Sequence, residues 1–446
     1  MLNYIWLGLI LAAVIIGGCT DRLKEVADQS FEMAEFAVMK TALPLVGIMA
    51  LWLGIMRLAE RAGLVTMFAR ALRPVLRWLF PEVPPDHPAM GSMVLNIAAG
   101  ILGLGNAATP LGLRAMKDLQ SLNPHPGTAT NAMCTFLAIN TSSIQLIPAT
   151  AIAILAANHS NNPTAIVGTS IIATTCAAIS AVTAAKLLQR LPVFRLRTPG
   201  PVEEKASVTE GPPLIQKVVE KPAASAPVEW WGKLILLIFL GFFVYLFLRL
   251  GFPALLGAPV RPEFATQNTF VRLVNAVSLI SVPFLLSFFP LYAVVRRVRI
   301  YEEFVEGAKE GFEVAIRIIP YLVAILVAIG MFRAAGGIDL LSRALNPVMR
   351  ALGFPADLLP IVLMRPLSGS GTLGMFAELV KHRGPDDLVS RMAATIYGST
   401  ETTLYVLAVY FGSVGIKRTR YALLAGLTAD AVGVIASVII CKAMFG

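Results

Sequence analysis

The chain has few charged residues and very little histidine or cysteine. Only 14% of its 446 residues are charged and 56% are hydrophobic, whereas a soluble domain carries roughly 25% charged residues. Four cysteines without a CxxC pair argue against a disulfide framework or a metal cluster. The four histidines, in or beside predicted loops, leave no Ser–His pair for catalysis: His87, His125, His159 and His382. These shortages predict a polytopic membrane protein that is not an enzyme and binds no metal.

The charged residues that are present are mainly basic, with 37 Lys and Arg against 27 Asp and Glu. The net charge of +10 would suit nucleic acid only on a soluble basic face, and the sequence offers none. Cytoplasmic loops of membrane proteins are rich in Lys and Arg, which explains the excess. Arg70, Arg73 and Arg77 favour an amphipathic helix along the membrane interface over a simple basic loop. We therefore expect the lipid bilayer, and no nucleic acid, as a partner.

Apolar stretches of roughly membrane-spanning length, each with at most one charged residue, recur along the chain, since a crossing needs ~20 apolar residues. They are Leu2–Thr20, Thr41–Met56, Pro88–Leu113, Gly127–Ala157, Thr164–Ala185, Leu234–Leu248, Leu273–Val295, Ile318–Phe332, Leu358–Ala377, Met392–Ile416 and Tyr421–Cys441. Between Arg190 and Trp230, prolines alternate with Glu, Lys, Ser and Ala, which is typical of a disordered linker. The predicted domains are residues 1–189, a cytoplasmic linker 190–229, and residues 230–446, which include one extra helix.

Two of these stretches contain helix breakers near their centres. Pro88–Leu113 carries Gly103-Leu-Gly-Asn-Ala-Ala-Thr-Pro110, and Leu358–Ala377 carries Arg365-Pro-Leu-Ser-Gly-Ser-Gly-Thr372. Irregular backbone at membrane depth survives only where it is buried in protein or lines a wet cavity. Each stretch therefore predicts a re-entrant helical hairpin with a polar tip.

The two halves repeat each other. Arg70–Arg77 matches Arg343–Arg350 at six of eight positions, and Leu111-Gly112 corresponds to Leu373-Gly374 further along. Ordered matches of this kind indicate an internal duplication. With the N-terminus in the cytoplasm, the extra helix inverts the second half, and the predicted cytoplasmic loops hold the majority of the Lys and Arg residues. The predicted fold class is an all-α polytopic membrane protein with two inverted-topology repeats, each with a re-entrant hairpin and a broken transmembrane helix.

Polar clusters interrupt a helix beside each tip, Asn140–Gln145 in the first half and Ser399–Thr403 in the second. A single Ser or Thr serves as a small packing residue between helices, but whole clusters beside both tips predict a polar cavity at the membrane midplane. Helix N-termini at the tips would suit an anionic or carbonyl-bearing ligand. The candidate solute-binding residues are Asn106, Thr109, Asn140, Thr141, Ser142, Ser143, Gln145, Ser368, Ser370, Thr372, Thr400, Glu401, Thr402 and Thr403.

Glu401 is the only charged residue between Met392 and Ile416. A carboxylate within the membrane costs ~2.5–3.5 kcal/mol on insertion scales, so it is a candidate for binding solute, Na⁺ or a proton. No other cofactor is expected. Asp430 is a second intramembrane acid, and Arg365 is the nearest expected cation. A structural ion pair of Arg365 with Glu401 or Asp430 is the alternative to a coupling role.

These motifs resemble spore maturation proteins A and B joined in one chain. Met49-Ala-Leu-Trp-Leu-Gly54, Gly105–Pro110 and Asn140–Ser143 resemble the A family. Ser368–Gly374 and Tyr397–Thr403 resemble the B family. Both families are similar to the nucleoside-recognition (Gate) class of membrane proteins, so the resemblance implies a multi-pass protein of the bacterial inner membrane and a link to spore maturation.

Two functions fit these observations. A secondary transporter would move a small polar solute, nucleoside-like or anionic, past the two tips with proton or sodium coupling. A membrane scaffold or regulator of envelope or spore maturation would instead use the linker to recruit a partner. The polar tips and Glu401 favour the transporter, and a homo-oligomer fits either function.

Overall fold

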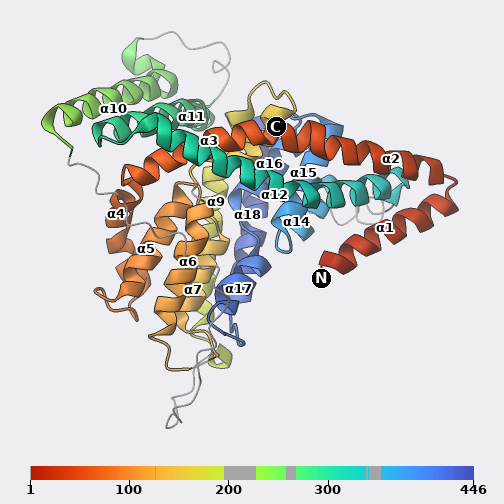
Figure 1. The fold of residues 1–446 in the computed structure, drawn as a ribbon, viewed down its shortest axis with the longest axis horizontal. Coiled ribbons are helices and arrows are strands. Elements are labelled where there is room, and N and C mark those ends of the chain that lie inside the picture. The colour runs from red at the N-terminus through yellow and green to blue at the C-terminus, as the bar shows by residue number, and fades with distance from the viewer. Residues whose placement is uncertain are drawn as a thin grey trace.

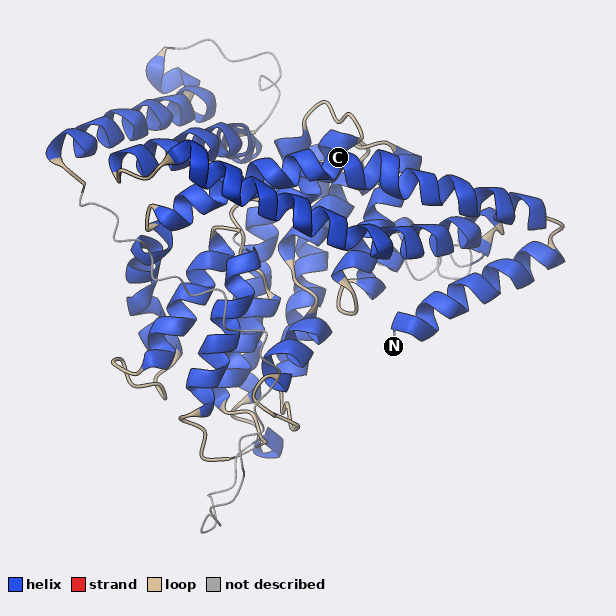
Figure 2. Ribbon diagram, viewed as in Figure 1, coloured by secondary structure: helices blue, strands red, loops and turns tan. Residues whose placement is uncertain are grey.

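The computed structural model of the chain describes residues 2–103, 105–125, 127–194, 228–257, 268–337, 340 and 353–446. These residues form helices joined by loops, with an isolated β-bridge between Thr128 and Arg418 (Figure 2). Five helical stretches among them are long and apolar enough to cross a membrane: Leu23–Arg61, Pro163–Leu188, Trp230–Gly251, Thr269–Val295 and Ala422–Phe445. The chain is an all-helical, multi-span membrane protein, as its composition predicts.

The first half begins with α1 (Leu2–Cys19), followed by one continuous helical stretch of α2 (Leu23–Glu35), the π-helix η1 (Phe36–Ala42) and α3 (Leu43–Arg61). The remaining elements of this half are α4 (Leu64–Leu79), α5 (Pro88–Ile101), α6 (Gly105–Gln120), α7 (Asn131–Thr141), α8 (Ala149–Ala157), η2 (Pro163–Ala165), α9 (Ile166–Leu188) and η3 (Pro192–Phe194). In α4, Arg70, Arg73 and Arg77 are exposed while Leu76 and Leu79 are buried, so this helix is amphipathic as predicted.

The second half begins with the extra helix, α10 (Trp230–Gly251). The elements that follow are η4 (Pro253–Leu256), α11 (Thr269–Val295), α12 (Ile300–Ala334), η6 (Ala356–Leu358), α14 (Leu359–Met364), α15 (Gly369–Arg383), α16 (Leu388–Ser399), α17 (Thr403–Gly412) and α18 (Ala422–Phe445). The repeat motif Arg343–Arg350 and linker residues 195–227 lie outside the described residues.

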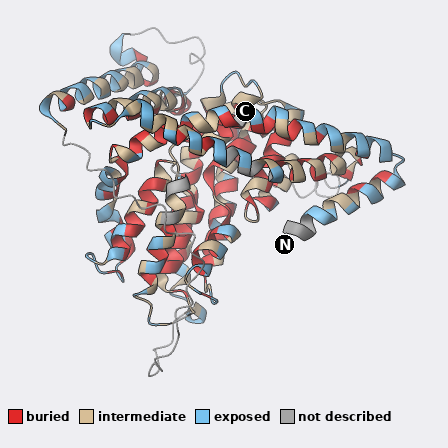
Figure 3. Cartoon of the chain, in the orientation of Figure 1, coloured by how far each residue is buried: buried red, intermediate tan, exposed pale blue. Residues whose placement is uncertain are grey.

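Two long helices cross the molecule above a bundle of the other helices (Figure 1). These are α3 and α12, which pack against each other, and α5, α6, α7, α9, α17 and α18 run below them. The pair α10 and α11 lies at one end of the molecule, and α1 lies at the other. Buried residues concentrate in the bundle, whereas α10 and α1 are largely exposed, as expected of lipid-facing helices (Figure 3).

The bundle is held together by close packing of α9 on α18. Alanines spaced four residues apart line the buried face of α9, and alanine and glycine do the same on α18: Ala173, Ala177, Ala181, Ala185, Ala425, Ala429 and Gly433. In a membrane, small residues at this spacing let two helix backbones approach closely. A Cβ added at Gly433 would lie 2.6 Å from Cγ2 of Thr400, which brings α18 directly against the break before α17.

Two expected spans are parts of longer helices. Thr41–Met56 lies within the continuous stretch Leu23–Arg61, and Ile318–Phe332 lies within α12. The charged residues that flank the two stretches do not end these helices. Arg57 pairs with Glu303 of α12 at 2.9 Å, and Arg333 pairs with Glu378 of α15. His382, expected in or beside a loop, lies in the last turn of α15.

At each expected hairpin or helix break, two helices are separated by non-helical backbone, and the re-entrant path of the hairpins stays a prediction. The first tip lies between α5 and α6, where Gly103 has φ +78°, a conformation that favours glycine. The second tip lies between α14 and α15, and the helix before it, α14, is only 6 residues long. The breaks lie between α7 and α8 and between α16 and α17, at the predicted polar clusters.

Candidate solute-binding site

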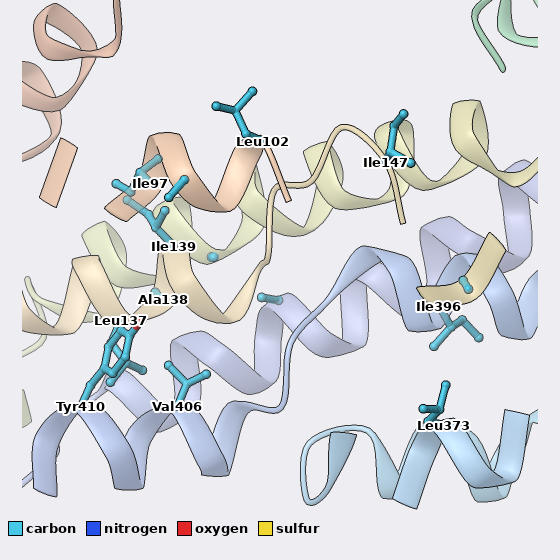
Figure 4. Packing of buried hydrophobic residues seen from close by; sticks show 14 of the residues in the cluster. Ile97, Leu102, Leu137, Ala138, Ile139, Ile147, Leu373, Ile396, Val406 and Tyr410 are labelled. Atoms are coloured by element: carbon cyan, nitrogen blue, oxygen red, sulfur yellow. The ribbon is translucent and has the colours of Figure 1, made fainter. Parts of the chain in front are cut away.

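A cavity of about 150 Å³ lies where the first hairpin, the break after α7 and the start of α17 meet. Its polar lining residues are Asn96, Thr109, Asn140, Ser143, Gln145, Glu401, Tyr405 and Tyr410. Figure 4 shows three apolar wall residues, Ile97 from α5, Ile139 from α7 and Val406 from α17, together with Tyr410 from α17. Ile396 and Leu373 of the second half lie at the other end of this view, away from the cavity.

The break after α7 is fixed by hydrogen bonds and by a left-handed residue. Ser143 has φ +41°, which is uncommon for a residue other than glycine and turns the chain out of the helix. The hydroxyl of Thr174 donates to the carbonyl oxygens of Ser142 and Ser143, each at 2.9 Å, so the end of α7 is capped from α9. The N–H of Leu146 donates to the carbonyl of Ile101 at 3.0 Å, which ties this break to the first tip.

A similar backbone hydrogen bond joins the second break to the second tip. The N–H of Leu404, beside the second break, donates to the carbonyl of Pro366 at the second tip over 3.0 Å. Ser368 caps α15 by accepting from the N–H of Gly371 at 3.0 Å. The Thr372 hydroxyl donates to the Ser368 carbonyl at 2.7 Å. The polar groups of the second tip are therefore hydrogen-bonded within the tip and to the second break.

A backbone hydrogen bond joins the two helix breaks. The N–H of Glu401 donates to the carbonyl of Thr141 at 2.8 Å. The carboxylate of Glu401 faces the cavity and accepts from the Ser143 hydroxyl at 3.5 Å and from the Thr402 N–H at 3.4 Å. Both distances lie at the long end of hydrogen bonding. The carboxylate is thus loosely held by the protein.

Arg365 contacts carbonyl groups rather than a carboxylate. Its guanidinium donates to the carbonyls of Thr400 and Tyr397, the latter at 2.9 Å, and lies 4.7 Å from the centre of the Tyr397 ring. Across the described ranges, no ion pair within 4 Å joins Arg365 to Glu401 or Asp430. The expected alternative of a direct ion pair is therefore wrong: Arg365 stabilises the carbonyl end of α16.

Asp430 lies outside the cavity lining, on α18. It is 5% exposed, and its Oδ2 accepts from the hydroxyl of Thr403 at 2.6 Å. Its Oδ1 is buried without a hydrogen-bond partner in the described part of the protein. Since Thr403 is the first residue of α17, Asp430 is positioned directly behind the segment that carries Glu401.

The structure brings together some of the predicted site residues and separates others. Thr109, Asn140, Ser143, Gln145 and Glu401 line the cavity. The other predicted residues with described side chains lie outside the lining, most of them buried: Thr141, Ser142, Ser368, Ser370, Thr372, Thr400, Thr402 and Thr403. The side chain of Asn106 lies outside the described part of the structure. The solute-binding role of the whole set stays a prediction.

Sequence reasoning missed three polar lining residues, Asn96, Tyr405 and Tyr410. Asn96 had a usable signal, because an amide in the uncharged run Pro88–Leu113 is as conspicuous as Asn106. The tyrosines had none, since aromatic residues are common in apolar helices. Tyr410 reaches the cavity because α6 has Gly112 opposite it, where an added Cβ would lie 2.2 Å from the tyrosine hydroxyl.

Comparison with known proteins gives matches along most of the chain. The nucleoside-recognition (Gate) model matches residues 42–158 and 315–417. Spore maturation protein B of Bacillus subtilis (strain 168) is 48% identical over 176 residues, 40% of this chain and 99% of that protein. Spore maturation protein A of the same organism is 44% identical over 182 residues, 41% of this chain and 92% of that protein.

A solved structure, that of the Alcanivorax borkumensis YdaH transporter, aligns with 99% of this chain and 97% of its own. The identity is 14% and the TM-score 0.38, too low to establish a shared fold. The resemblance to spore maturation proteins is confirmed by the sequence matches, while the assignment of the A-like motifs to the first half stays a prediction. The chain belongs to the nucleoside-recognition (Gate) domain family and joins, in one polypeptide, regions similar to spore maturation proteins A and B.

Proposed function

We propose that the chain is a secondary transporter of the bacterial inner membrane, built from two inverted repeats, that moves a small polar solute through the cavity beside Glu401. The hairpins enter and leave the membrane on one side, and Asp430 and Glu401 are the residues that couple movement to a proton or Na⁺. The observation that carries this proposal is the polar cavity at two helix breaks, because broken helices at membrane depth line binding sites in transporters of this design.

The packing of repeat partners supports the duplication. Corresponding helices pack directly on each other, α3 on α12 and α9 on α18. Contacts between non-corresponding helices also come in equivalent pairs, with α7 on α9 matched by α16 on α18, and α7 on α18 matched by α16 on α9. A pseudo-two-fold axis between the halves would produce this pattern.

Contacts between loops support the inverted orientation. The predicted topology puts Asn158–Pro163 and the α15–α16 loop outside, and Asp386 of the latter accepts hydrogen bonds from Ser160 at 2.7 Å and from the Asn161 N–H at 2.9 Å. The same topology puts the loops before α7 and before α18 inside. There, the N–H groups of Lys417 and Arg418 donate to the Gly127 carbonyl at 2.9 and 3.0 Å.

The test is access to the cavity from both membrane faces. A Ser143→Cys variant, made in a background with Cys19→Ser and Cys176→Ser, is reacted with a membrane-impermeant thiol reagent in right-side-out and in inside-out vesicles. Those two native cysteines are replaced because they are not buried, whereas Cys134 and Cys441 are. A transporter that alternates between two states exposes position 143 to both faces in turn.

Reaction from both faces is the expected outcome. The matched control is Ser437→Cys, a buried serine on α18 outside the cavity lining, which is expected to react from neither face. Reaction of position 143 from a single face, or from neither, would overturn the transporter proposal and favour a scaffold.

A further inference from the structure

The described cavity contains a negative charge without a positive partner. Glu401 is the charged residue of the lining, and within the described ranges no Lys, Arg or His nitrogen lies within 4 Å of its carboxylate. The neighbouring residues whose side chains are not described, 104–107 and 110, include no Lys or Arg. An intramembrane carboxylate is costly unless a cation or a proton neutralises it.

The neighbouring amides present acceptors to the same space. Asn96 is 1% exposed, and its Nδ2 donates to the carbonyl of Ala108 at 2.7 Å, which fixes the orientation of the amide. Its Oδ1 is buried and has no hydrogen-bond partner in the described part of the protein. Asn140 is held in a similar manner, with Nδ2 donating to the carbonyl of Phe136 at 2.9 Å. Its Oδ1 accepts from the Tyr410 hydroxyl at 3.3 Å, and an amide oxygen can accept a second hydrogen bond. A buried acceptor without a donor indicates a missing ligand or water.

The position that would attract an anion is already occupied. The N-terminus of α17 faces the cavity region, but the N–H of Thr402 beside it is directed at the carboxylate of Glu401 itself, 3.4 Å away. A second negative charge there would be repelled by Glu401 without compensation from a cation. The lining therefore disfavours the anionic solute that the tips alone predicted.

The volume limits the size of the solute in this conformation. A cavity of about 150 Å³ is comparable to one known to hold a single benzene molecule. A nucleoside has about three times as many non-hydrogen atoms as benzene, so much of it would project beyond this cavity. The tyrosines of the wall, Tyr405 and Tyr410, add π-faces that attract cations.

We propose that the solute of this cavity is a small organic cation with N–H donors, a primary alkylammonium compound, whose charge pairs with Glu401 and whose N–H groups bind Asn96 and Asn140. This inference rests on the proposed function, since it names the solute class of the same site. It replaces the nucleoside-like or anionic solute as the substrate class.

The experiment compares probes of equal length and different head group on the purified, full-length protein. Thermal unfolding and calorimetric titration are measured with n-butylammonium, n-butanol and butyrate, and with uridine, at constant ionic strength set by KCl. The inference predicts saturable stabilisation by n-butylammonium and none by the other three. Tetramethylammonium, a cation without N–H donors, is expected to bind at least tenfold more weakly.

Two variants test whether n-butylammonium binds in the cavity. Glu401→Gln removes the charge and is expected to weaken n-butylammonium binding at least tenfold. The matched control, Glu306→Gln, removes an exposed carboxylate on α12 that pairs with Lys309, and is expected to bind as the wild type does. Equal binding by Glu401→Gln, stronger binding of butyrate or uridine, or no binding of any probe would each overturn the inference.

These outcomes are separable from those of the transporter proposal. If position 143 reacts from both faces but n-butylammonium does not bind, the protein transports and the solute class is wrong. If position 143 reacts from one face only, the transporter proposal fails whatever the probes do.

Discussion

The backbone N–H of Glu401 donates a 2.8 Å hydrogen bond to the carbonyl oxygen of Thr141, joining the helix break before α17 to the break after α7. This bond crosses between the halves of the chain and brings the carboxylate of Glu401 against Ser143 in the wall of the cavity. The second half thus contributes the charge, and the first half contributes most of the polar wall.

Glu401→Gln is expected to fold and melt like the wild type. The glutamine keeps the size of the side chain and can accept one of the two hydrogen bonds that Ser143 and Thr402 donate. Both bonds are long, so the free energy of unfolding should change by less than ~1 kcal/mol. Arg365→Met is the contrasting variant, because it leaves the buried carbonyls of Tyr397 and Thr400 without their donor and should cost ~1–3 kcal/mol. Thermal unfolding in detergent measures both. A loss of ~3–5 kcal/mol in Glu401→Gln would instead indicate a buried ion pair.

Gly433→Ala is expected to destabilise the bundle. The new Cβ would meet Cγ2 of Thr400 at 2.6 Å and Cβ of Ala177 at 3.4 Å, so α18 must move away from the break. Overpacking of this kind costs ~1–3 kcal/mol. The control is Gly241→Ala in α10, where nothing lies within 4 Å, and there the better helix propensity of alanine should prevent any loss. Equal melting temperatures for the two variants would contradict the close contact of α18 with the break.

Protonation of Asp386 should lower the stability of the folded protein at acid pH. Burial acts to raise the pKa of this carboxyl, but the N–H of Asn161, the Ser160 hydroxyl and Arg391 outweigh it, so the pKa lies below its ordinary value. A lowered folded-state pKa gives stability that is present above the unfolded pKa of ~3.9 and is lost as pH falls through the folded value. Asp386→Asn should cost ~1–2 kcal/mol at neutral pH and flatten the decline of the melting temperature below pH ~4. Parallel pH profiles for the variant and the wild type would exclude this role.

Two surface positions should lie on opposite faces of the membrane. Asn161→Cys in the α8–α9 loop and Lys417→Cys before α18 are both exposed. In intact cells, with Cys19 and Cys176 replaced, an impermeant reagent should modify position 161 directly and position 417 only after permeabilisation. Modification of both from the same side would contradict the inverted repeat.

The linker should be dispensable for assembly. The halves are held by α3 against α12 and by α9 against α18, contacts that do not involve residues 195–227. Two fragments produced by a cut near Ala224 should therefore co-purify and melt as one complex, as the similarity to two separate spore maturation proteins also leads one to expect. Fragments that purify separately would show that covalent linkage is required.

The tips and breaks could be predicted because helix breakers and polar residues are conspicuous in uncharged segments. Gly103, Ser143 and Glu401 all fall in such interruptions, and all lie at the cavity. The ends of the long helices could not be predicted in that manner. Lys40 appeared to end a span, yet it lies inside the π-helical part of a continuous helix. Lys40 is exposed, so its ammonium group can reach water while the helix continues past it.

The role of Arg365 could not be predicted from the sequence either. Its position before the second tip made it the expected partner of a carboxylate, but the backbone carbonyls of the α16 terminus lie nearer and take its donors. The two tips also contribute unequally to the cavity, which the sequence did not indicate. The cavity wall includes the first tip and excludes Ser368, because the second tip is closed by its own cap.

The central claim is that the cavity beside Glu401 holds a solute, and direct imaging tests it best. The measurement is a high-resolution electron cryomicroscopy map of the full-length protein in lipid nanodiscs, recorded with and without n-butylammonium. The account predicts added density within hydrogen-bonding distance of the carboxylate of Glu401 and of Oδ1 of Asn96. A cavity filled by protein side chains or by a lipid acyl chain in both maps would contradict it.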